Sequence, residues 1–202
     1  MKTLKDIFAE ARKDKWAIPH FNFANLEMLK AIVEAAAEKR SPVLVGLSEG
    51  ERSFVGLRQA VALVKSYREE LGIPVFLNAD HSYSVETALQ AVDAGFDSVH
   101  IDLSKKPFDE NLAGTKQVVE HAKSKNPDIS IEAEIGYFVT DSSKVYDAVV
   151  DVPTESLARP EEGAQLFRET GVDRLAPVVG GIHGVAKNEG HLDIERVKAI
   201  HD

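Results

Sequence analysis

Two residues that can bind metals or transfer protons stand side by side in this sequence, Asp80 and His81 in "IPVFLNADHS". The apolar run before them predicts a buried strand, and the pattern after them predicts a helix, so both fall where the chain turns. A carboxylate at such a position often only caps the next helix. An adjacent carboxylate and imidazole can also transfer protons or hold a metal ion.

Side chains with the same capability follow other apolar runs. His183 lies in "VVGGIHGVAKN", whose glycines would let backbone amides approach a bound anion. Glu132 and Glu134 alternate with apolar residues, so both point to one face of an expected strand, and Asp102 follows another strand. Carboxylates buried on one face need a metal or paired cations. The chain has no cysteine, and imidazoles with carboxylates suit hard or borderline divalent metals, zinc first among them. We interpret the other histidines as surface or packing residues: His20, His100, His121, His191 and His201.

Six apolar runs would position these side chains, at residues 16–22, 42–48, 73–80, 98–104, 129–136 and 173–181. Segments with helical spacing separate most of them, at residues 26–39, 57–71, 85–94, 108–124 and 160–170. Ser84 and Pro160 are typical helix starts, and Gly72, Gly95 and Gly171 are typical helix ends. Apolar strands that alternate with helices predict a parallel sheet built from βα units.

The polar residues favour a barrel over an open, doubly wound sheet. They follow the carboxyl ends of the strands, which meet at one mouth in a (β/α)8 TIM barrel but are spread along an edge in an open sheet. No Gly-x-Gly-x-x-Gly motif follows the first strand, which weakens a dinucleotide-binding interpretation. We therefore predict an α/β fold of the (β/α)8 barrel type, as a single domain over residues 1–202. Only about six βα units are present, whereas a full barrel takes about 250 residues.

The composition excludes several other classes of function. With 44% hydrophobic and 28% charged residues, the chain can bury a sizeable core and does not have the composition of a disordered protein. Its net charge of -9 argues against nucleic acid or an anionic membrane as the main partner. No apolar stretch approaches the length of a membrane span, and the first residues lack the apolar core of a signal peptide. We expect a soluble, cytoplasmic protein.

Six segments match one enzyme family in order and spacing: "PHFNFANLE", "SPVLVGLSEG", "NADHS", "GFDSVHIDLSKKPFDEN", "IEAEIG" and "VVGGIHGVAK". Through them the sequence, over residues 4–202, resembles the class II, metal-dependent ketose-bisphosphate aldolases. The resemblance implies a glycolytic lyase that reversibly cleaves fructose or tagatose 1,6-bisphosphate. The products would be dihydroxyacetone phosphate and glyceraldehyde 3-phosphate, and the enzyme would be a homodimer or homotetramer.

The resemblance also implies roles for individual residues. His81 and His183 match two of the three histidines that bind the catalytic Zn2+, and Asp80 matches the acid that handles the C4 hydroxyl proton. Asp102 and Glu134 match acidic positions around the metal. The other matches are substrate-binding positions: Asn22, Ser48 near a phosphate, and Gly181 and Gly184 in a turn near the ketose phosphate and a monovalent cation.

The sequence departs from the family pattern in two places. The family's third zinc histidine lies about one βα unit beyond His183, past Asp202. We therefore expect these residues to be a C-terminally truncated aldolase, or a degenerate relative, with little activity alone. The loop "GYFVTDSSKVYD" lacks the family's glycines and acidic pair, so we assign no base for the C3 proton. Two alternatives stay open: a Schiff-base aldolase that uses Lys105 or Lys106, and a non-catalytic barrel that binds a sugar phosphate or a partner.

Overall fold

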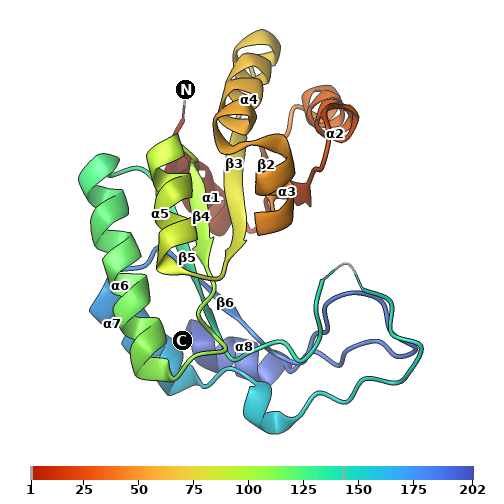
Figure 1. Cartoon of the computed structure of the whole chain (residues 1–202), viewed down its shortest axis with the longest axis vertical. Coiled ribbons are helices and arrows are strands. Elements are labelled where there is room, and N and C mark those ends of the chain that lie inside the picture. Colours follow the sequence, from red (N-terminus) through yellow and green to blue (C-terminus); the bar gives the residue numbers. More distant parts are fainter. Residues whose placement is uncertain (1, 143) are drawn as a thin grey trace. The chain divides into compact units, whose positions relative to one another are not determined.

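The computed structural model describes residues 2–142 and 144–202, in which parallel strands alternate with helices (Figure 1). The strands are β1 (His20–Asn22), β2 (Val43–Leu47), β3 (Val75–Ser82), β4 (Ser98–Ile101), β5 (Ser130–Ile135) and β6 (Arg174–Pro177). The helices are α1 (Leu4–Asp14), α2 (Leu26–Lys39), α3 (Glu49–Val55), α4 (Leu57–Leu71), α5 (Val85–Ala94), α6 (Phe108–Lys125), α7 (Pro160–Thr170) and α8 (Ile194–His201), with a short 3-10 helix at Thr154–Ser156. The strands lie in the sheet in chain order, which confirms the α/β fold and the parallel sheet.

The chain divides into two compact units. The first unit contains the described residues up to Ile101 together with Gln117–Ile131, and the second contains Asp102–Lys116 together with Glu132–Asp202. β1 to β4 belong to the first unit, and so does Ser130, the first residue of β5. The backbone N–H of Ser130 donates to the carbonyl oxygen of Asp97 at 3.1 Å. The rest of β5 pairs in parallel with β6 in the second unit. The predicted single domain and the closed barrel stay predictions.

The core of the first unit explains why its strands are apolar nearly throughout. All five residues of β2 are buried, as are the first five of β3. At the amino ends of these strands, Leu44 and Phe76 pack against Leu4 and Ile7 of α1. Burying one such side chain contributes about 1.5–3 kcal/mol relative to its exposure. The amphipathic α1 is therefore held on the sheet by its apolar face.

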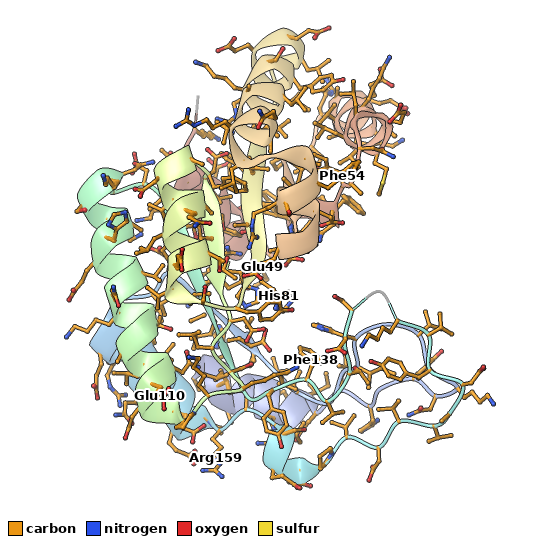
Figure 2. The ribbon with its side chains drawn as sticks, viewed as in Figure 1. Glu49, Phe54, His81, Glu110, Phe138 and Arg159 are labelled. Atoms are coloured by element: carbon orange, nitrogen blue, oxygen red, sulfur yellow. The ribbon has the colours of Figure 1, made fainter. Side chains whose placement is uncertain are left out.

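Helix boundaries follow the predicted starts and stops closely, with one exception. α2, α4, α5 and α7 have the predicted bounds, and Gly72, Gly95 and Gly171 end three of them in the left-handed conformation. The exception is α3, which carries no apolar stripe: its one buried residue is Arg52, while Phe54 is 81% exposed (Figure 2). The sequence did not predict α3, because a helix of only seven residues whose buried side chain is charged shows no periodic pattern of apolar residues. Among the described residues, no helix is long and apolar enough to cross a membrane.

Candidate active site

Asp80 and His81 lie in a β-bulge near the carboxyl end of β3. The register between β3 and β4 shifts between Ala79 and Ser82, so that Asp80 and His81 together face the single residue His100. His81 has a φ of 44°, in the left-handed region, which costs a non-glycine residue about 1–3 kcal/mol. In a regular strand, neighbouring side chains point to opposite faces. Bulges often occur beside active sites, where they redirect a side chain. This bulge allows the side chains of Asp80 and His81, although adjacent in sequence, to contribute to the same site.

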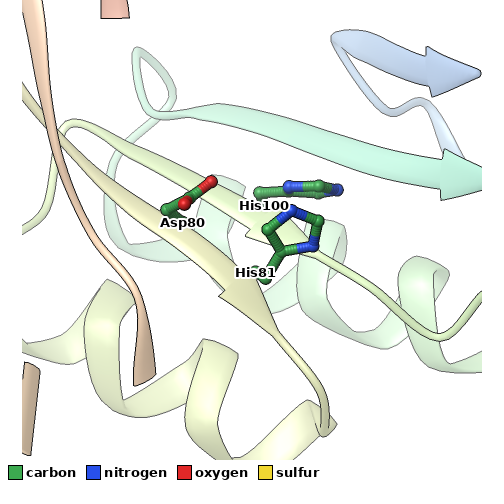
Figure 3. A group of neighbouring side chains, drawn as sticks. All are labelled: Asp80, His81 and His100. Carbon is green, nitrogen blue, oxygen red and sulfur yellow. The ribbon is translucent and has the colours of Figure 1, made fainter. Parts of the chain in front are cut away.

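Asp80, His81 and His100 form a compact cluster in the first unit (Figure 3). One potential ligand atom of each lies within 4.8 Å of the other two, and the rings of His81 and His100 have centroids 4.4 Å apart. Two imidazoles and a carboxylate are a donor set that fits zinc. The interpretation of His100 as an ordinary packing residue missed this proximity. No sequence signal reveals it, because the bulge brings His100 opposite the Asp80–His81 pair.

Asp80 is held in its ionised form. Burial raises the pKa of Asp80, but the charge of His81, a hydrogen bond from Asn22 and the charges of His20 and His100 outweigh it. The net result is a pKa below the usual range of an aspartate. The Asn22 Nδ2 atom donates to Asp80 Oδ2 at 2.9 Å. Asp80 is therefore a carboxylate at neutral pH, the form that accepts a proton.

Ser48 and Asn22 both contact the start of α3. Ser48 is the N-cap of α3, and its hydroxyl and backbone N–H form a capping box with Glu51. The Ser48 N–H donates to Glu51 Oε2 at 2.6 Å, and Asn22 Nδ2 donates to the same oxygen at 3.2 Å. The structure thus gives both residues a structural partner. Their contacts with a substrate stay predictions.

In the second unit, Asp102 and Glu134 meet through Ser104. The Ser104 hydroxyl donates to Asp102 Oδ1 at 2.6 Å and lies 3.4 Å from Glu134 Oε1. Both carboxylates are buried, with 8% and 2% exposure, and buried carboxylates of this kind suit a cation. Glu132 instead pairs with Arg174 at 3.1 Å, so its charge is neutralised within the chain.

His183 lies in a loop of the second unit, where its ring stacks on Phe138 with centroids 3.7 Å apart. The next residue, Gly184, has a φ of 74°, and a Cβ there would lie 2.4 Å from the carbonyl oxygen of Lys144. Loop packing alone therefore requires glycine at position 184. Gly181 is under no such constraint, because a Cβ there would make ordinary contacts at 3.8 Å. The predicted roles of His183, Gly181 and Gly184 stay predictions.

We expect Gly46→Ala to disturb Asp80 through β1. A Cβ on Gly46 would lie 2.2 Å from His20 Nε2 and 2.4 Å from Asn22 Oδ1, well inside van der Waals contact. Displacing Asn22 removes the hydrogen bond that orients Asp80, so kcat/KM for aldol cleavage should fall about tenfold, in the range found for supporting residues. Gly50→Ala is the control, since a Cβ on Gly50 meets nothing within 4 Å. Equal rates for the two variants would contradict this coupling.

The fold and the cluster first define a class of protein. Parallel strands that carry acid–base and metal-binding side chains at their carboxyl ends are typical of α/β-barrel enzymes. The chain is 40% identical, over 205 residues, to the fructose-bisphosphate aldolase of Geobacillus stearothermophilus, covering 99% of this chain and 68% of the relative. It is 38% identical, over 201 residues, to that of Staphylococcus aureus strain Mu50, with 98% and 68% coverage. The crystal structure of the YdjI aldolase from Escherichia coli K12 matches with a TM-score of 0.78 at 30% identity, covering 95% of this chain and 65% of that one.

The family model described as fructose-bisphosphate aldolase class-II matches residues 2–202. The chain therefore belongs to the class II fructose-bisphosphate aldolase family, whose members are lyases that cleave a ketose bisphosphate. It spans about two thirds of the length of these relatives. The Schiff-base alternative gains no support, because Lys105 and Lys106 are both exposed to solvent, whereas a Schiff-base lysine is typically desolvated in an apolar pocket.

Proposed function

We propose that this chain carries the zinc-binding and proton-transfer residues of a class II aldolase, with His81 as a metal ligand and Asp80 as the general acid–base group. The observation that carries the proposal is the β3 bulge. It sets a carboxylate that accepts a hydrogen bond from Asn22 directly beside an imidazole in a strained backbone conformation. Strain of this kind persists where the surrounding structure enforces it, and it clusters at active sites.

The donor set of the chain fits a zinc ion. His81 is the proposed ligand of the first unit, with His100 as a further nitrogen within reach. The proposed ligands of the second unit are His183 and the two acidic residues, Asp102 and Glu134, by analogy with the family. A bound zinc ion would supply a Lewis acid that polarises the substrate carbonyl.

Asp80 performs the proton transfer at the C4 hydroxyl. In cleavage, its carboxylate accepts the hydroxyl proton as the C3–C4 bond breaks, and the electron pair of that bond remains on the C3 fragment. In condensation, the protonated Asp80 returns the proton to the new C4 oxygen. Asn22 donates to one carboxylate oxygen and leaves the other for the substrate. We assign no residue to the proton transfer at C3.

The substrate contacts, the full barrel, the localisation and the oligomeric state are proposed by analogy with the family. Asn22, Ser48, Gly181 and Gly184 would contact the ketose bisphosphate, and a monovalent cation would lie near its phosphate. The described strands would be six of the eight in a (β/α)8 barrel. The enzyme would work in the cytoplasm as a homodimer or homotetramer, which analytical ultracentrifugation can test.

Removal of metal tests the proposal. We expect the purified chain to contain zinc by elemental analysis. A chelator should abolish the low rate at which this chain cleaves fructose 1,6-bisphosphate, and added Zn2+ should restore it, because a bound zinc ion would polarise the carbonyl. Activity that resists the chelator, with protein trapped by borohydride and substrate, would instead support the Schiff-base alternative. A chain that neither binds zinc nor cleaves the substrate would support the non-catalytic alternative.

A further inference from the structure

Helix α3 places a buried guanidinium against the backbone of the bulge. Arg52 is only 5% exposed, and its four hydrogen bonds all reach short segments at strand ends. Its Nη1 atom donates to the carbonyl oxygens of Leu47 at 2.8 Å and Asp80 at 3.1 Å. Its Nη2 atom donates to the carbonyl oxygen of His81 at 3.4 Å and to Ser82 Oγ at 3.2 Å. Three of the four acceptors thus belong to three consecutive residues of β3.

These contacts match the part of β3 that needs external support. The left-handed conformation of His81 is unfavourable for a residue with a Cβ, so neighbouring groups must hold it. A guanidinium is planar and presents its donors in a fixed geometry. Arg52 binds the carbonyl oxygens of Asp80 and His81, which flank the φ and ψ bonds of His81. It therefore fixes the relative orientation of these two carbonyls. A lysine would keep the charge but not this geometry.

A second side chain of α3 fixes the chain just after the bulge. Glu49 Oε1 accepts hydrogen bonds from the Tyr83 N–H at 2.9 Å and from Thr87 Oγ1 at 2.7 Å, and lies 3.9 Å from Arg52 Nη2. Figure 2 shows Glu49 on α3 and His81 at the end of β3. Burial lowers the pKa of Arg52, and the charges of Glu49 and then Asp80 oppose this. An arginine stays protonated in proteins, so a charged side chain braces the bulge.

We propose that Arg52 is a positioning residue for the zinc site. It holds the β3 bulge in the conformation in which His81, the proposed metal ligand, and Asp80, the proposed proton acceptor, lie at the same site. The inference rests on the proposed function, and it adds a residue that acts through the backbone of the site and not on the substrate. Supporting residues of this kind typically change metal affinity about 10- to 100-fold when they are replaced.

The other end of the same strand offers a matched control. Arg68 is a partly buried arginine whose Nε atom donates to the Val75 carbonyl oxygen at 2.7 Å. Its Nη2 atom pairs with Asp97, which also accepts from the Leu77 N–H at 2.8 Å. Arg68 therefore anchors the amino end of β3 through the same kind of hydrogen bond, from a guanidinium to a backbone carbonyl. None of these hydrogen bonds reaches a residue of the bulge. Its replacement should affect folding and leave the metal ligands in place.

The experiment compares Arg52→Lys with Arg68→Lys in the full chain. Zinc affinity is measured by competition with a chelator, ligand geometry by the visible absorption of the Co2+ form, and stability by urea unfolding of the metal-free protein. We expect Arg52→Lys to weaken zinc binding about 10- to 100-fold and to shift the Co2+ spectrum. Arg68→Lys should lose comparable stability and keep both properties of the parent.

Ser82→Ala provides a second, milder variant in case Arg52→Lys does not fold. It removes one acceptor of Arg52 without changing any charge, so zinc binding should weaken in the same direction by a smaller factor. The proposal is overturned if the folded variants of Arg52 and Ser82 keep the zinc affinity and Co2+ spectrum of the parent. A parent chain that binds no zinc would overturn the proposed function, and this positioning role with it.

Discussion

Asp80→Asn is expected to slow cleavage of the ketose bisphosphate about 10²- to 10⁴-fold, the usual contribution of a positioned general acid–base group. The amide cannot accept the C4 hydroxyl proton, although its oxygen can still accept the hydrogen bond from Asn22. Zinc affinity should change little, because the proposed ligand is the neighbouring His81. The measurement is kcat at saturating zinc, with zinc affinity determined on the same sample.

Asp93→Asn is the matched control for this variant. Asp93 is an exposed aspartate of α5 that pairs with His121 at 2.8 Å, and a charge there is screened by solvent. Its replacement should leave kcat unchanged. If Asp80→Asn binds zinc and retains kcat within about tenfold of the parent, Asp80 does not transfer the proton.

Replacement of His81 should have the second large effect, on metal binding itself. Removing a ligand that must be in place before the ion binds should lower zinc affinity by at least about 100-fold, and activity should return only in part at high zinc concentration. His81→Asn is the preferred variant, since asparagine tolerates the left-handed conformation that His81 adopts at a φ of 44°. Elemental analysis after dialysis checks the result. His121→Asn, at a partly exposed histidine of the same unit that pairs with Asp93, should retain the zinc content of the parent. Full zinc occupancy in His81→Asn would exclude His81 as a ligand.

Most of the secondary structure could be predicted from the sequence, because its determinants are local. The pattern of α2 buries Leu29, Val33 and Ala36 along one face, and Ser84 caps α5 through a hydrogen bond from Thr87. The continuous apolar run of β2 is typical of a strand covered on both sides. The family was also predictable, because its motifs are short segments that keep their order along the chain, "NADHS" among them.

The arrangement of the site was decided by the tertiary structure. Asn22 and Asp80 are 58 positions apart, and Arg52 and Ser82 are 30 apart, so no periodicity links either pair. His100 becomes a neighbour of Asp80 and His81 only because a bulge shifts the register between two strands. Thus the sequence by itself determined the strands, the helices other than α3, the family and the adjacent pair Asp80 and His81. Strand pairing, a bulge and a buried arginine decided what those residues face, because such contacts form only after distant segments pack together.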